Sequence, residues 1–151
     1  VEVPAAVAAA AAEVAAEFFS VSESVEFCND PVDEVWDESY LPPFDEWFPA
    51  QEVRALGFEP AIDADGTRVQ ILATIGIDRH VDEMSGFVLA WVLFNDGLRF
   101  NQGGSSHVTK PGEWFIFDDF RPHEVRDRKK STVYLFVHVP LRKLTIQEWG
   151  K

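Results

Sequence analysis

Two histidines and an aspartate in the second half of the chain have the residue types of a metal site. His80 and Asp82 are two residues apart, so their side chains share a face if this segment is extended. His123 opens a later β-rich segment. Two imidazoles and one carboxylate can hold Fe(II) and leave three coordination positions open. A His-x-Asp pair by itself is more often a surface or capping pair, so the prediction depends on the elements around it.

Those elements are predicted to be short β-strands with no helix between them. The segment after Asp63-Ala64-Asp65-Gly66-Thr67, a turn signal, is rich in β-branched and aromatic residues, and Asn95-Asp96-Gly97 is typical of a hairpin. Gly103 and Gly104 belong to a predicted loop. About seven strands are expected, over 68–77, 86–94, 98–100, 107–110, 113–117, 123–127 and 132–139. This spacing indicates a sandwich, jelly roll or barrel and argues against a βαβ fold.

Residues 1–67 are predicted to be an acidic, helical and irregular part of the same single domain. The alanine-rich segment 4–19 favours a helix, and short helices are expected near 31–38 and 44–56. Residues 68–140 would form the β core, and 141–151 a C-terminal tail. The aromatic residues of the first part are expected to pack on the core, with a substrate cleft as the alternative.

The charge of the chain restricts its partners. The 151 residues carry a net charge of −13, with 16 acids and one base in residues 1–67 against 10 acids and 12 bases in residues 68–151. This balance argues against binding to nucleic acid or to an anionic membrane. The single cysteine, Cys28, excludes an intramolecular disulfide, and no apolar run reaches membrane-spanning length. We therefore expect a soluble, cytoplasmic protein.

The order of motifs over about residues 75–140 resembles that of the 2-oxoglutarate/Fe(II)-dependent dioxygenases. The segment PGEWFIFDDFRPHEVRD (111–127) is especially similar to the aspartyl/asparaginyl β-hydroxylase branch. The matching pieces are, in order, His80-Val81-Asp82, FVLAWVLFNDG (87–97), Gly103-Gly104, KPGEWFIFDD (110–119), His123-Glu124-Val125 and Lys130-Ser131-Thr132.

The resemblance implies a mainly β fold, a double-stranded β-helix (a jelly-roll or cupin-like barrel), with the N-terminal helices packed outside. It implies that His80, Asp82 and His123 bind Fe(II) and are the catalytic residues. It also implies 2-oxoglutarate as cosubstrate, O₂, and hydroxylation of a small-molecule or peptide substrate.

In this family a basic residue after the second histidine binds the distal carboxylate of 2-oxoglutarate. The family usually has an arginine there, whereas this chain offers Arg126, Arg128, Lys129 and Lys130. If His123 faces inward, the odd positions 125, 127 and 129 also face inward, and across a tight turn the parity can switch. We therefore assign the role to Lys130, with Thr132 on the same face of the returning strand.

The alternative is a cupin-like metal- or ligand-binding module without oxygenase activity. Cupins usually present two histidines at the first motif, so His80 with Asp82 favours the dioxygenase. Of the other histidines, His138 is expected in the core, and His107 is expected to have a solvent or turn role and not to bind the metal. Asp118 and Asp119 are expected to accept hydrogen bonds from backbone donors in the bend before His123.

Overall fold

The computed structural model describes most of the second half of the chain and a smaller share of the first. The described residues are Ala5, Ala9, Glu13, 32–36, 48–63, 66–67, 69–74, 76–82, 86–94, 97–127 and 134–149. No helix among them is long and apolar enough to cross a membrane.

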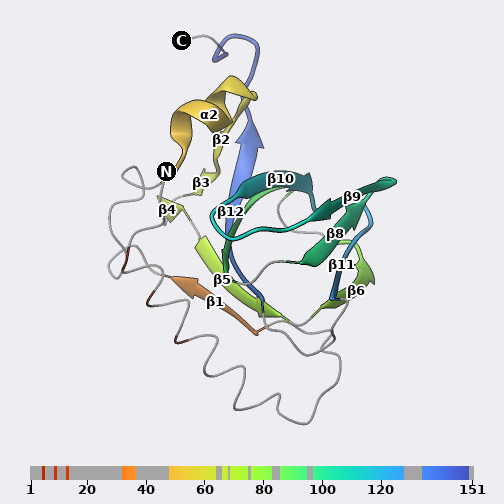
Figure 1. Ribbon diagram of the computed structural model, residues 1–151. Coiled ribbons are helices and arrows are strands. Elements are labelled where there is room, and N and C mark those ends of the chain that lie inside the picture. Colours follow the sequence, from red (N-terminus) through yellow and green to blue (C-terminus); the bar gives the residue numbers. More distant parts are fainter. Residues whose placement is uncertain are drawn as a thin grey trace.

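Two antiparallel sheets face each other (Figure 1). The larger sheet has the order β1-β5-β12-β7-β10, and β2 also pairs with β12; the smaller has the order β6-β11-β8-β9. The large sheet contains β1 (Val32–Trp36), β2 (Phe58–Pro60), β5 (Val69–Thr74), β7 (Phe87–Phe94), β10 (Trp114–Asp118) and β12 (Tyr134–Lys143). The small sheet contains β6 (Ile77–His80), β8 (Leu98–Gln102), β9 (Ser105–Val108) and β11 (His123–Asp127). Helix α2 (Ala50–Ala55) and the short strands β3 (Ile62–Asp63) and β4 (Gly66–Thr67), which pair with each other, lie between β1 and β5 in the sequence.

The strand pairs are nested, and this nesting defines the fold. β8 pairs with β9, β7 with β10, β6 with β11 and β5 with β12, and successive pairs alternate between the two sheets. A long hairpin whose pairs alternate in this way is a jelly roll, or double-stranded β-helix. The predicted fold class is therefore confirmed.

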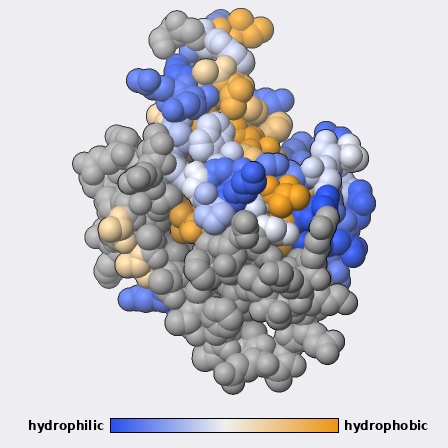
Figure 2. Space-filling view, in the orientation of Figure 1, coloured by the Kyte–Doolittle hydropathy of each residue, from blue (hydrophilic) through white to orange (hydrophobic). Residues whose placement is uncertain are grey.

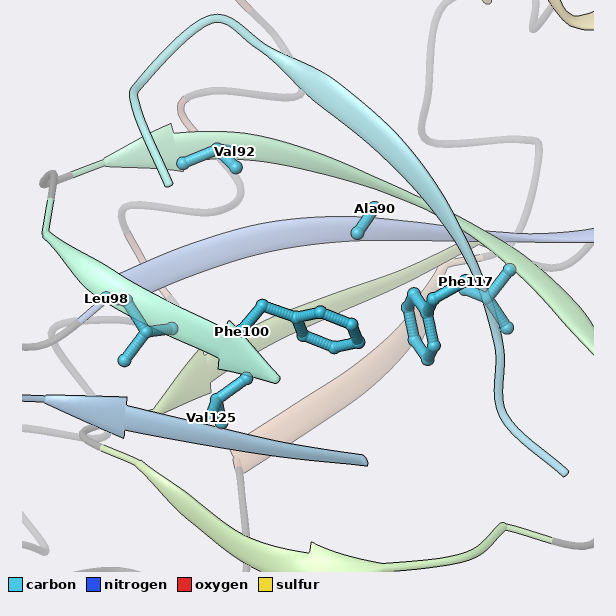
Figure 3. Close-up of a cluster of buried hydrophobic side chains, with 7 residues drawn as sticks. Ala90, Val92, Leu98, Phe100, Phe117 and Val125 are labelled. Atoms are coloured by element: carbon cyan, nitrogen blue, oxygen red, sulfur yellow. The ribbon is translucent and has the colours of Figure 1, made fainter. Parts of the chain in front are cut away.

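Apolar side chains from both sheets fill the space between them. Figure 3 shows Phe100 and Phe117 with their rings directed toward each other, and the ring centroids are 4.9 Å apart. The cluster consists of Val88, Ala90 and Val92 on β7, Leu98 and Phe100 on β8, Phe117 on β10 and Val125 on β11. Every second residue of these strands faces the partner sheet, as strand geometry requires.

The other face of the large sheet is buried as well. Leu89 and Trp91 of β7 pair with Val139 and Val137 of β12, and all four are at most 1% exposed. Trp91 is thus a core residue. A strand that is covered on both faces needs apolar residues at every position, which explains the unbroken sequence FVLAWVLF.

The C-terminal end of β12 is held to β2 and α2 by ion pairs. Arg142 pairs with both Glu59 and Glu148, and Arg54 binds Glu59 at 3.1 Å. The hydrogen bonds from Arg142, and a further one from the backbone of Thr145, lower the pKa of Glu148 to about 2.

Apolar side chains are also exposed at this end of the molecule. Figure 2 shows them gathered beyond the barrel, over α2 and the end of β12. The large exposed apolar residues of these segments are Leu56, Ile146 and Trp149.

Two predicted elements in the first part of the chain need correction. Residues 32–36 form strand β1, so the helix predicted over 31–38 is wrong; pairing with all of Val69–Ala73 on β5 outweighs local helix propensity. In the region predicted as a helix over 44–56, α2 begins only after Pro49, and 44–47 lie outside the described residues. Ala5, Ala9 and Glu13 are helical and exposed, but the packing of the 4–19 helix lies outside the described residues.

The turns were predicted with mixed success. Strands β3 and β4 pair on either side of the turn predicted over 63–67, as expected, and residues 64–65 lie outside the described ones. The hairpin predicted at 95–97 is wrong, because β7 and β8 lie in different sheets and the chain crosses between them. The predicted loop at Gly103-Gly104 is a tight hairpin between β8 and β9; both glycines have positive φ (57° and 81°), which a two-residue turn of this kind needs. The single strand predicted over 68–77 is divided into β5 and β6.

Candidate metal site

Strand pairing brings the two histidines together. His80 is the last residue of β6 and His123 is the first of β11, and the two are direct partners in the antiparallel ladder. Their ring centroids are 4.3 Å apart. Two residues that are distant in sequence therefore meet because the backbone ladder places them opposite each other.

Asp82 joins the histidines from just beyond the strand. Its backbone N–H donates to the carbonyl of Asp119 at 2.8 Å. Its Oδ2 lies 3.5 Å from Nε2 of His80 and 3.4 Å from Nε2 of His123. One potential ligand atom from each of the three side chains lies within 4.8 Å of the others, and no other such group of three occurs in the described part of the chain.

Backbone carbonyls set the orientation of both imidazoles. Nδ1 of His80 lies 2.7 Å from the carbonyl oxygen of Asp78, and Nδ1 of His123 lies 2.8 Å from that of Arg121. A carbonyl oxygen only accepts hydrogen bonds, so each Nδ1 carries the proton. In the neutral ring this leaves the lone pair on Nε2, the atom that faces Asp82. Metal-binding histidines are commonly oriented in this way.

The spacing of these atoms suits a single metal ion. Ligand atoms about 2.1 Å from a metal lie roughly 3.0–3.4 Å apart at angles between octahedral and tetrahedral. The two measured distances to Asp82, 3.4 and 3.5 Å, are close to that range. The side chain of His123 is 5% exposed, that of His80 33% and that of Asp82 48%, so the site is buried on one side and open to solvent on the other.

Aromatic side chains lie behind His123, inside the barrel. The rings of Phe100 and Phe117 are 6.0 and 5.1 Å from that of His123. His138 on β12 packs edge-on against Phe117 at 5.8 Å, as expected for a core histidine. Burial lowers the pKa of His138 to about 4, and the charge of His123 adds to the effect. His138 is therefore neutral at neutral pH.

The turn before His123 contains polar contacts that connect the site to its surroundings. The carboxylate of Asp118 accepts a hydrogen bond from the N–H of Phe120 at 3.0 Å, and that of Asp119 accepts one from Gly86 at 2.6 Å. The prediction that these aspartates bind backbone donors in the bend before His123 is confirmed for Asp118; Asp119 also binds a backbone donor, but this donor is Gly86, outside the bend. Gln102, whose amide Nε2 donates to the carbonyl of Asp118 at 2.6 Å, was not predicted. Its role depends on its pairing with His123, which no local pattern reveals.

Lys130 and Thr132, the predicted 2-oxoglutarate contacts, lie outside the described residues, as do Arg128 and Lys129. The remaining candidate, Arg126, is 65% exposed and pairs with Glu124 at 3.0 Å. Burial raises the pKa of Glu124, but hydrogen bonds from Asn101 and Arg126 outweigh it and leave this pKa below its ordinary value.

Two further observations agree with the predicted geometry. His123 and Val125 are buried while Arg126 is exposed, so the inward positions of β11 are the odd-numbered ones, as predicted. His107 is exposed and pairs with Glu113 at 2.8 Å, away from the three-residue group, in agreement with its predicted solvent role; it lies in strand β9 and not in a turn.

The fold and the site together define a jelly-roll barrel with one His-Asp-His group at its edge. No protein-family model and no curated protein sequence matches the chain. Solved structures that resemble it include an RmlC-like cupin from Desulfovibrio desulfuricans (15% identity, TM-score 0.40, covering 55% of this chain and 79% of that one). A cupin domain from Bordetella pertussis has 14% identity and a TM-score of 0.41 (57% and 94% covered). The cupin domain of an XRE-family transcriptional regulator from Enterobacter cloacae has 17% identity and a TM-score of 0.39 (72% and 95% covered). With TM-scores below 0.5, the fold assignment rests on the strand pairing of this chain.

Proposed function

We propose that the protein is an Fe(II)- and 2-oxoglutarate-dependent dioxygenase that hydroxylates a small-molecule or peptide substrate. One observation carries the proposal: two imidazole Nε2 atoms and a carboxylate oxygen converge, with both Nδ1 atoms already bound to carbonyls. Two histidines and one carboxylate suit Fe(II) and leave three positions for other ligands.

The protein's own residues would contribute binding, orientation and shielding. When bound, Fe(II) supplies the activation of O₂ that is coupled to oxidation of 2-oxoglutarate to succinate and CO₂. His80 and His123 would bind as neutral ligands, and Asp82 would offset part of the metal charge. Because Asp82 is on the exposed side and His123 on the buried side, cosubstrate and substrate would enter past Asp82.

The dicarboxylate also needs a cation, because a buried carboxylate without a partner is costly. No lysine or arginine among the described residues is buried, and Arg126 lies on the outward face of β11. We therefore retain Lys130, with Thr132, as the proposed contact for the distal carboxylate of 2-oxoglutarate.

The second candidate function is a cupin-like module that binds a metal or small ligand and carries out no oxidation. It is supported by the same three ligands and by the absence of a buried cation among the described residues. The two functions differ in whether the metal and 2-oxoglutarate bind together and whether succinate is released.

Absorption spectroscopy and a product assay together separate the two functions. Under anaerobic conditions the dioxygenase is expected to show the visible band of an Fe(II)–2-oxoglutarate chelate, and His80→Ala and His123→Ala should abolish it. Asp82→Ala should weaken iron binding and stop turnover. His107→Ala is the matched control, because His107 is paired with Glu113 and should leave the band unchanged.

Succinate release in air should then be screened against amino acids, peptides and nucleosides. A metal-binding chain that gives neither the band nor succinate would contradict the dioxygenase and support the binding module. If Fe(II) and Co(II) both fail to bind, the metal site itself is wrong.

A further inference from the structure

Asp82 is held differently from the other two ligands of the proposed site. His80 and His123 face each other within the ladder of β6 and β11, so the strands fix their positions. Asp82 lies two residues beyond the end of β6, and its side chain is 48% exposed. The ladder therefore does not fix the carboxylate, and some other contact must hold it near the histidines.

The buried Asp119 provides that contact through three hydrogen bonds. Its carbonyl oxygen accepts from the N–H of Asp82 at 2.8 Å, and its own N–H donates to the carbonyl of Gly86 at 2.6 Å. Its carboxylate Oδ1 accepts from the N–H of Gly86, also at 2.6 Å. Asp119 is 3% exposed. These bonds attach Asp82 and Gly86, the residues at the two described ends of the connection between β6 and β7, to Asp119.

Gly86 is suited to this arrangement because it has no side chain. Its φ is +86°, a backbone conformation that other residues rarely adopt, and a Cβ there would lie 3.2 Å from the ring of Phe120. The N–H of Gly86 can therefore approach the carboxylate of Asp119 while Phe120 covers the same position.

The same turn also reaches His123. The amide of Gln102 donates to the carbonyl oxygens of Asp118 (2.6 Å) and Arg121 (3.3 Å). The Arg121 oxygen is also the acceptor for Nδ1 of His123. The turn at 118–121 thus holds Asp82 on one side and orients His123 on the other.

We propose that Asp119 is the positioning residue of the metal site and sets its affinity by holding Asp82 in place. The inference rests on the proposed metal site. Without the Asp119 carboxylate, the Gly86 N–H loses its acceptor and the connection opens, so Asp82 must be ordered again each time a metal binds. Loss of such an outer contact typically weakens metal binding 10–100-fold.

Titration with Co(II), followed by its absorption, tests the proposal with no need for substrate. Asp119→Ala should weaken Co(II) binding about 10–100-fold. Asp119→Asn, which keeps an acceptor oxygen at the same position, should remain within about threefold of the unmodified protein. The matched control is Glu113→Ala, because the Glu113 carboxylate binds His107 and the N–H of Lys110, away from the three-residue group.

A double-variant cycle separates positioning from a general structural role. In the Asp82→Ala background, Asp119→Ala should change Co(II) affinity less than about threefold, because its effect depends on Asp82. Equal effects in the two backgrounds would overturn the proposal while leaving the metal site intact. Failure of the unmodified chain to bind Co(II) would overturn both.

Hydrogen exchange tests the same idea in the unmodified protein, in case Asp119→Ala does not fold. If Asp119 couples the connection to the metal, saturating Co(II) should slow exchange of the Asp82 and Gly86 amides at least tenfold by linkage. The amide of Val137, which pairs with Trp91 in the middle of the large sheet, serves as the reference. Unchanged exchange at both amides, with Co(II) bound, would overturn the proposal.

Discussion

Acidification should destabilise the metal-free protein through His138. Burial lowers the pKa of His138 from the ordinary 6.5 to about 4, and the charge of His123 adds to this effect. The unfolded chain therefore takes up a proton at this residue at a higher pH than the folded chain does. Stability from the neutral ring is fully present above about pH 6.5 and is lost progressively as the pH falls toward 4.

The size of the loss follows from the shift in pKa. A difference of 2.5 units between 6.5 and about 4 corresponds to about 3 kcal/mol once the pH is below both values. By the same relation, about 2 kcal/mol is already lost at pH 5. Because His138 is not fully buried, contact with solvent reduces these figures, and we expect about 1–2 kcal/mol at pH 5.

Urea unfolding at pH 7.5 and pH 5 measures the loss of stability that protonation of His138 causes. Fluorescence of the buried Trp91 can report unfolding, and EDTA keeps metal from contributing. His138→Gln removes the titrating group, so its loss of stability between the two pH values should be smaller than that of the unmodified protein by about 1–2 kcal/mol. Any change in the free energy of unfolding that the substitution causes equally at both pH values cancels in this comparison. The same pH dependence in both proteins would refute the reasoning.

Three further predictions concern the core, the cosubstrate and the C-terminal ion pairs. Leu98→Ala should lower the free energy of unfolding in urea by about 2–5 kcal/mol, because Leu98 is fully buried between the sheets. In the succinate assay, Lys130→Ala should raise the apparent 2-oxoglutarate requirement at least about tenfold, through loss of a charge-assisted hydrogen bond. Arg126→Ala, on an exposed side chain, should change this requirement little. The opposite pattern would assign the 2-oxoglutarate contact to Arg126 instead of Lys130. Arg142 holds the pKa of Glu148 at about 2, so the stability due to this carboxylate is present above about pH 4.5 and is lost as the pH falls toward 2. Between pH 5 and pH 2.5, the melting temperature of Glu148→Gln should therefore fall less than that of the unmodified protein.

Local patterns predicted the parts of the fold that depend on side-chain alternation. The apolar run of β7 indicated a buried strand, and the odd-numbered positions of β11 face inward as expected. His80 and His123 were predicted to lie together, and the ladder of β6 and β11 places them opposite each other. The period of two that strand geometry imposes holds on β11, whereas β7 is apolar at every position because both of its faces are buried, and the meeting of the two histidines was implied by the order of motifs.

Strand partners were less predictable, because they depend on residues far away in the chain. The turn signal at 95–97 is typical of a hairpin, yet β7 pairs with β10 and β12 and leaves β8 to the other sheet. Strand β1 forms by pairing with the edge of β5, and the sequence of 32–36 alone does not reveal this partner. Gln102 belongs to the site only because the register sets it opposite His123.

The central position of β12 determines when the barrel can form as the chain is synthesised. This strand pairs with β5, β7 and β2, and it lies between β5 and β7 in the sheet. A nascent chain that ends before Tyr134 therefore leaves the facing edges of β5 and β7 unpaired, although β7 can already pair with β10. Unpaired edges of apolar strands are prone to aggregation. The large sheet can thus be completed only after all of its other strands have been synthesised, and until then the edges of β5 and β7 must be protected from aggregation.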